Sequence, residues 1–168
     1  MLKQGLALCA LMVFSTGCAL LGPMAVPGGS LRLSELAKDG DAARRASIRL
    51  TLDGLEEDAA GQQAQARTSY EQALRVDGLN PYAYLALARH YADGPEHDRA
   101  ESYLQQTESL LISQDRLDDR VQAHLSGLRG MVLWRQGYSS EASPYLQHAR
   151  RLAPAVWRDG RLDASELY

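Results

Sequence analysis

The chain has 168 residues, 45% of them hydrophobic, and a formal net charge of −3 at pH 7. This length allows one ordinary domain, and the apolar share argues against wholesale disorder. The slightly acidic balance, with a sequence pI near 5.8, leaves no basic footprint for nucleic acid. Alanine, leucine, glutamine, arginine and glutamate are abundant, whereas phenylalanine occurs once. This composition favours helices over strands, and we expect an all-α protein.

The N-terminus has the pattern of a secretory signal. Lys3 is followed by the short apolar run GLALCALMVF and then by STGCALLGP, and no charged residue stands between Lys3 and Arg32. A positive start, a brief apolar core and small residues before a cleavage site are typical of a signal peptide. The small residues lead directly into Cys18. The stretch resembles a bacterial lipoprotein signal, in which cleavage precedes the cysteine and acyl chains are attached to its sulfur and its new amino group.

This resemblance implies a signal peptide over residues 1–17 and lipidation of Cys18. Several acyl chains would hold the protein firmly on a membrane. Ala19 follows the cysteine, and resemblance to lipoprotein sorting in Gram-negative bacteria implies the outer membrane, on its inner leaflet facing the periplasm.

Two other interpretations of this stretch stay open. Residues 5–21 could form an uncleaved membrane helix, although they are few for the roughly 20 residues that a bilayer needs. An ordinary secretory peptide could also be cut nearby, which would make Cys18 incidental. Ser15 stands where lipoprotein signals usually carry an aliphatic residue.

Residues 18–40 are predicted to be the lipidated cysteine and a flexible tether. The stretch ALLGPMAVPGGS has two prolines, three glycines and no charge, a composition typical of linkers. The next stretch, LRLSELAKDGD, is compatible with a turn of helix that ends at Asp39, Gly40 and Asp41.

From Asp41 onward, a set of small and large residues recurs. Ala66, Tyr70 and Ala73 stand at offsets of zero, four and seven. This step places all three residues on one helix face, where the small ones let a neighbouring helix approach. The same spacing returns in two later sets, Ala100, Leu104 and Thr107, and Ala142, Leu146 and Ala149.

Each set is preceded by a second amphipathic run that ends at or near a glycine, namely Gly61, Gly94 or Gly137. Three helix–turn–helix units are therefore predicted over residues 41–154. Pro81 is expected to begin a helix, since the N–H that proline lacks has no partner there anyway. The link SLLISQDRLDDR is longer than the repeat allows, which predicts extended helices or a tilted third unit.

The unit resembles the tetratricopeptide repeat, a helix–turn–helix of roughly 34 residues. The resemblance covers about residues 46–154 and implies a short α-solenoid of about three repeats with a continuous core. The residues that carry it are Leu87, Ala88, Tyr91, Gly94, Ala100 and Leu104 in the second unit, and Gly130, Gly137, Ala142, Leu146, Ala149 and Pro154 in the third.

Residues 155–168 are predicted to be a C-terminal cap or loose tail. Val156, Trp157, Leu162 and Leu167 could cover the last helix, whereas Asp159-Gly160 interrupts the segment. A short capping turn followed by a loose tail is expected.

The sequence contains no recognised catalytic, phosphate-binding or metal-binding motif. His90 and His97 straddle a turn and are interpreted as solvated residues. The run EED at 56–58 is interpreted as a solvated helix face, and the acidic residues at 115–119 as the start of a helix. We expect no enzyme activity, no cofactor and no metal site.

In tetratricopeptide folds the first helices of successive units line a concave groove that receives peptides or partner helices. Tyrosine, tryptophan, methionine and arginine are enriched at such interfaces. The other interpretation of Tyr82 and Trp134 is local packing. Carried onto this sequence, the partner-binding groove positions are Tyr82, Leu85, Arg89 and Ala92 in the second unit, and His124, Met131, Trp134 and Arg135 in the third.

These inferences predict a lipid-anchored periplasmic adaptor that holds a protein or peptide partner near the membrane, for example during assembly of an envelope machine. No small-molecule substrate is indicated. The alternative is a lipoprotein whose repeats self-assemble into a structural spacer.

Overall fold

The computed structural model describes residues 31–168, and every regular element in that range is a helix. The predicted signal peptide, Cys18 and the first part of the predicted tether lie outside the described residues. The predicted all-α fold is confirmed. Its helices are α1 (Leu33–Leu36), α2 (Ala42–Ala59), α3 (Gln63–Val76), α4 (Pro81–Asp93), α5 (His97–Ser113), α6 (Asp119–Arg135), α7 (Ser139–Leu152) and α8 (Ala164–Leu167).

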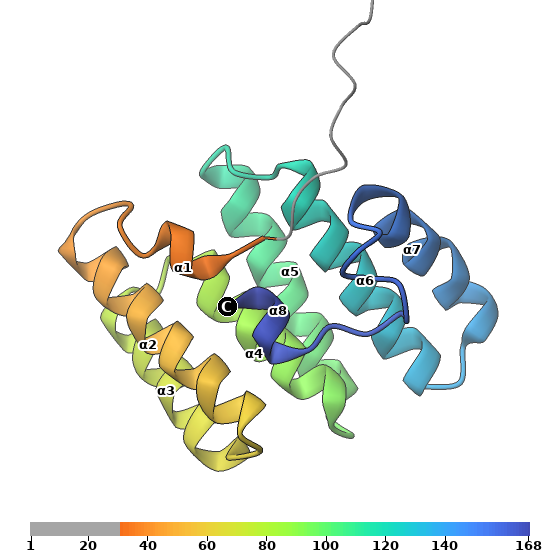
Figure 1. The fold of residues 1–168 in the computed structure, drawn as a ribbon, viewed down its shortest axis with the longest axis horizontal. Helices are drawn as coiled ribbons and strands as arrows, with labels where there is room; N and C mark the ends of the chain where they lie inside the picture. Colours follow the sequence, from red (N-terminus) through yellow and green to blue (C-terminus); the bar gives the residue numbers. More distant parts are fainter. Residues whose placement is uncertain (1–30) are drawn as a thin grey trace, which may run out of the picture.

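Residues 42–152 form three helical hairpins, α2–α3, α4–α5 and α6–α7, which stand side by side as a short α-solenoid (Figure 1). Gly61 follows α2 with φ of 76° and Gly137 follows α6 with φ of 90°, a backbone region that glycine enters without steric cost. The long link before the third hairpin is partly an extension of α5, which runs to Ser113.

Helix starts are set by local chemistry that the sequence displays. Pro81 occupies the first position of α4, and the Asn80 side chain accepts a hydrogen bond from the Tyr82 N–H at 3.1 Å. The Asp118 side chain accepts from the Val121 N–H at 2.9 Å and so caps α6. The predicted helix starts at Pro81 and in the acidic run 115–119 are confirmed.

The repeated sets of small and large residues lie on the packed faces of the second helices of the hairpins, and in the third set Leu146 of α7 packs against Gly130 of α6. Ala66, Tyr70 and Ala73 of α3 are fully buried, and so are Ala100 and Leu104 of α5. Burying each large apolar side chain contributes about 1.5–3 kcal/mol of favourable transfer free energy. The small residues beside it allow the helices to pack closely.

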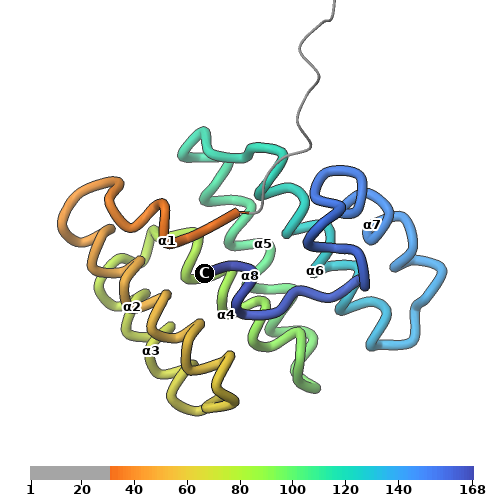
Figure 2. The backbone as a smooth tube through the Cα atoms, in the orientation of Figure 1, coloured from red at the N-terminus to blue at the C-terminus, as the bar shows by residue number. Residues whose placement is uncertain are grey.

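The two ends of the described chain lie side by side near the middle of the molecule (Figure 2). Ser34 donates from its N–H to the Tyr168 carbonyl oxygen at 3.1 Å and from its hydroxyl at 2.6 Å. Leu31 and Leu33 are buried. The stretch around α1 is therefore part of the packed fold and departs from the tether predicted over residues 18–40. None of the helices within residues 31–168 is long and apolar enough to cross a membrane.

Candidate functional site

The C-terminal segment, residues 155–168, returns across the face of the solenoid that α2, α4 and α6 line (Figures 1 and 2). Its helix α8 contacts both α2 and α4. Trp157, Leu162 and Leu167 are at most 1% exposed. This segment differs from the loose tail expected beyond a capping turn, because its apolar side chains are buried against the first helices of the hairpins.

Trp157 is seated against a glycine in the middle of α6. A Cβ atom built on Gly127 would lie 2.2 Å from two atoms of the Trp157 ring, far inside van der Waals contact. Glycine costs helix stability at an interior position. At Gly127 the absence of a side chain leaves room for the Trp157 indole. The contact between them joins the third hairpin to the C-terminal segment.

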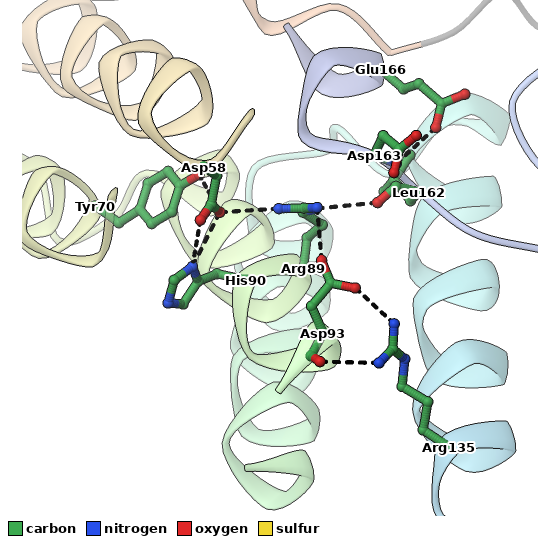
Figure 3. A network of polar contacts seen from close by, with 9 residues as sticks. All are labelled: Asp58, Tyr70, Arg89, His90, Asp93, Arg135, Leu162, Asp163 and Glu166. Atoms are coloured by element: carbon green, nitrogen blue, oxygen red, sulfur yellow. Dashed lines mark hydrogen bonds and ion pairs between the residues drawn. The ribbon is translucent and has the colours of Figure 1, made fainter. Parts of the chain in front are cut away.

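Arg89 of α4 is the centre of a polar network beneath this segment, which Figure 3 shows. Its Nε donates to the Leu162 carbonyl oxygen at 3.1 Å. One terminal nitrogen donates to Asp58 of α2 at 3.0 Å, and the other donates to Asp93 at 2.7 Å. One guanidinium therefore holds α2, the end of α4 and the C-terminal segment together.

Asp58 has two further partners in the network. The His90 Nδ1 lies 2.8 Å from one carboxylate oxygen, and the Tyr70 hydroxyl donates to the other at 3.1 Å. Burial and the neighbouring Asp58 carboxylate raise the pKa of Tyr70 above its usual value, so this hydroxyl remains a donor. The Asp58 side chain is only 3% exposed. The interpretation of residues 56–58 as a solvated face is wrong for Asp58, whose charge is compensated by Arg89.

Arg135 of α6 joins the same network from the third hairpin. It donates to the Asp93 carboxylate at 2.9 Å and to the Asp93 carbonyl oxygen at 3.0 Å (Figure 3). The network thus bridges all three hairpins. Its charged groups pair with one another, an arrangement suited to holding the hairpins together, although the buried Nε of Arg135 has no hydrogen-bond partner within residues 31–168. Residues 31–168 contain no group of three or more His, Cys, Asp or Glu side chains placed to hold a metal ion.

The structure separates the predicted groove residues into two groups. One group is buried under the chain's own C-terminal segment or in the helix interfaces, and in this conformation it has almost no surface to offer a partner. The other group, Trp134 and Arg135, lies at the end of α6, where Trp134 is 58% exposed. The buried group comprises Tyr82, Leu85, Arg89, Ala92, His124 and Met131.

Trp134 and Arg135 border an open cleft of about 470 Å³ between α6, α7 and the C-terminal segment. We call it the Trp134 cleft. Methionine, leucine and tryptophan side chains supply its apolar lining, and three arginines and one aspartate supply its charge. The lining residues are Met131, Trp134, Arg135, Leu146, Arg150, Asp159, Gly160 and Arg161.

His124 of α6 lies in the interior beside Trp157, with the ring centroids 6.2 Å apart. It is fully buried, and neither ring nitrogen has a hydrogen-bond partner within the described part of the chain. Burial lowers the pKa of His124 from 6.5 to about 4, against a smaller opposing effect of Asp118. The imidazole is therefore neutral at pH 7.

Acidification should weaken the fold through His124. Because its pKa is lower in the folded state, the unfolded chain takes up the proton first, and stability falls as the pH drops from about 6.5 towards 4. The loss from this group reaches about 3 kcal/mol near pH 4. Urea unfolding of the native protein and a His124→Leu variant at pH 7 and pH 4.5 measures it. The variant should lose much less stability on acidification; equal losses would contradict the assignment.

The chain matches no protein-family model, no curated protein and no solved structure.

Proposed function

We propose that this protein is a lipid-anchored adaptor of the bacterial envelope, built from tetratricopeptide-like hairpins, that binds a segment of another protein. The Trp134 cleft is the observation that carries the proposal. The chain has two tryptophans; Trp157 is fully buried, whereas Trp134 is 58% exposed beside arginines. Tryptophan and arginine dominate binding energy at protein interfaces when they line a pocket.

The rest of the molecule supports a binding role. The polar network and the C-terminal segment hold three hairpins in one arrangement, so that the Trp134 cleft is formed before a partner arrives, and less ordering entropy is lost on binding. Acyl chains on Cys18 would confine the cleft to the membrane surface. A partner attached to the same membrane would then meet it at a raised effective concentration.

Affinity capture from detergent-solubilised envelopes tests this function. A partner recovered with the native protein should be lost with Trp134→Ala and retained with Tyr138→Ala. Tyr138 is the matched control because it is an aromatic residue just beyond α6, it is 55% exposed, and it does not line the cleft. Equal recovery of the partner with both variants would exclude the Trp134 cleft as the binding site. Recovery of this chain alone would favour the self-assembling spacer.

The anchor is tested in the same preparation with Cys18→Ala. Cells fed labelled palmitate should incorporate it into the native protein and not into this variant. Equal incorporation into both would contradict lipidation of Cys18.

A further inference from the structure

The lining of the Trp134 cleft has the opposite charge to the protein as a whole. It contains three arginines and one aspartate, whereas the whole chain carries a net charge of −3. The excess is local to the lining, because residues 139–168 as a whole contain four arginines and four acidic residues. Positive charge on the wall of a cleft favours oppositely charged partners there.

Within the cleft, two of the three guanidinium groups are available to a ligand. Arg135 is engaged by Asp93. Arg150 donates from Nε to the Trp157 carbonyl oxygen at 3.1 Å, and neither Arg150 nor Arg161 forms an ion pair with a carboxylate of residues 31–168. Both side chains are exposed.

Asp159, the acidic residue of the lining, has its own partner. Its carboxylate accepts a hydrogen bond from the backbone N–H of Arg161 at 3.0 Å. The carboxylate keeps its negative charge, but Arg150 and Arg161 outnumber it on the side of the cleft that α7 and the C-terminal segment line.

The apolar part of the cleft lies beside these arginines. Trp134 presents more than half of its surface, and the lining includes Met131, which is buried, and Leu146, which is half-buried. A cleft of about 470 Å³ is large enough to take an anchoring side chain. Contact with an aromatic or branched apolar side chain would remove the exposed indole from water, and carboxylates on either side would meet Arg150 and Arg161.

We propose that the Trp134 cleft binds an acidic segment of another protein, with one apolar side chain against Trp134 and flanking carboxylates on Arg150 and Arg161. This inference rests on the proposed adaptor function and adds the binding surface and the chemical class of the partner. Arginine pairs with carboxylates in a planar, two-bonded geometry, which makes the site selective for acidic groups.

Acrylamide quenching of tryptophan fluorescence in the full-length, detergent-solubilised protein tests the proposal. Trp157 is fully buried, so the quenchable emission belongs to Trp134. The probe is an acetylated, amidated peptide of sequence DEDLFDED. We expect it to protect Trp134 saturably, and expect two control peptides, KRKLFKRK with basic flanks and DEDGSDED without the apolar pair, to bind at least about tenfold more weakly.

Two charge reversals locate the contact. Arg161→Glu should weaken the probe peptide about tenfold, whereas Arg151→Glu should change its affinity less than about threefold. Both variants alter the net charge equally and both side chains are exposed, but only Arg161 lines the cleft. An equal loss of peptide affinity in both variants would mean that the peptide responds only to the net charge of the protein. That result would overturn the contact assigned to Arg161.

The remaining outcomes separate this inference from the adaptor function. Absence of protection by the acidic peptide up to about 1 mM, or equal protection by the basic peptide, would overturn the inference. A partner lost with Trp134→Ala in the capture experiment would still support the adaptor. Protection of Trp134 that rises with protein concentration in the absence of peptide would assign the cleft to a second copy of this chain and would also overturn the inference.

Discussion

Replacing Trp157 with alanine is expected to lower the free energy of unfolding by about 3–5 kcal/mol, a large share of the stability of a domain this size. The indole is fully buried, and α6 keeps a glycine beneath it. Without the indole, a cavity opens between Gly127 and the C-terminal segment, and the segment loses its largest anchor. Urea unfolding followed by circular dichroism measures the loss.

Trp134→Ala is the matched control for this prediction, because the same truncation is made at a residue that is 58% exposed. Its effect should stay within about 0.5 kcal/mol, as is usual for surface substitutions. If Trp157→Ala cost no more than Trp134→Ala, the C-terminal segment would not be docked on α6 in solution.

Replacing Arg89 with methionine is expected to cost about 3–5 kcal/mol, because the substitution leaves the Asp58 carboxylate buried without its guanidinium. The Asp58 side chain is 3% exposed in its pair with Arg89. The same change removes the hydrogen bond to the Leu162 carbonyl oxygen, so the C-terminal segment should also loosen. Chemical denaturation gives the free energy, and hydrogen exchange of residues 155–168 reports the loosening.

Arg67→Met provides the comparison for Arg89. Arg67 pairs with Glu71 on the surface of α3, with both side chains 50% exposed. An exposed pair of this kind contributes about 0–1 kcal/mol. Similar losses in the two variants would contradict the central role given to Arg89.

The hairpins could be predicted because their signals are local. A set such as Ala66, Tyr70 and Ala73 repeats within a few residues of itself, and its spacing defines one helix face without reference to the rest of the chain. The caps are similarly local: Asn80-Pro81 and Asp118 mark helix starts by their own chemistry. The all-α solenoid could be predicted because such patterns extend over only a few neighbouring residues.

The position of the C-terminal segment could not be predicted in the same way. Trp157, Leu162 and Leu167 are separate apolar residues that follow neither a helical nor a strand period. Their apolar character predicts that they are buried, but not which helices they are buried against. One signal was present: Gly127 stands within a predicted helix, where glycine often marks a close packing contact. Trp157, which packs against it, lies thirty residues further along the chain, and nothing in the sequence around Trp157 indicates this contact.

The groove prediction shows the limit of a family resemblance. Residue type cannot distinguish a groove arginine from a core arginine, and Arg89 became a core residue because Asp58, thirty-one residues before it in the chain, supplies the opposite charge. Trp134 is 58% exposed at the end of α6, where residues 159–161 of the C-terminal segment border the cleft without covering the indole. Both outcomes depend on contacts between distant parts of the chain.

Photocrosslinking in intact cells tests the proposed adaptor role of the Trp134 cleft most directly. A benzophenone-bearing amino acid is placed at position 134 or, as the matched control, at position 138, and the products are identified by mass spectrometry. We expect a crosslink to one other protein from position 134, through a segment rich in aspartate and glutamate, and none to that protein from position 138. Equal crosslinking from both positions, or crosslinks only between copies of this chain, would contradict it.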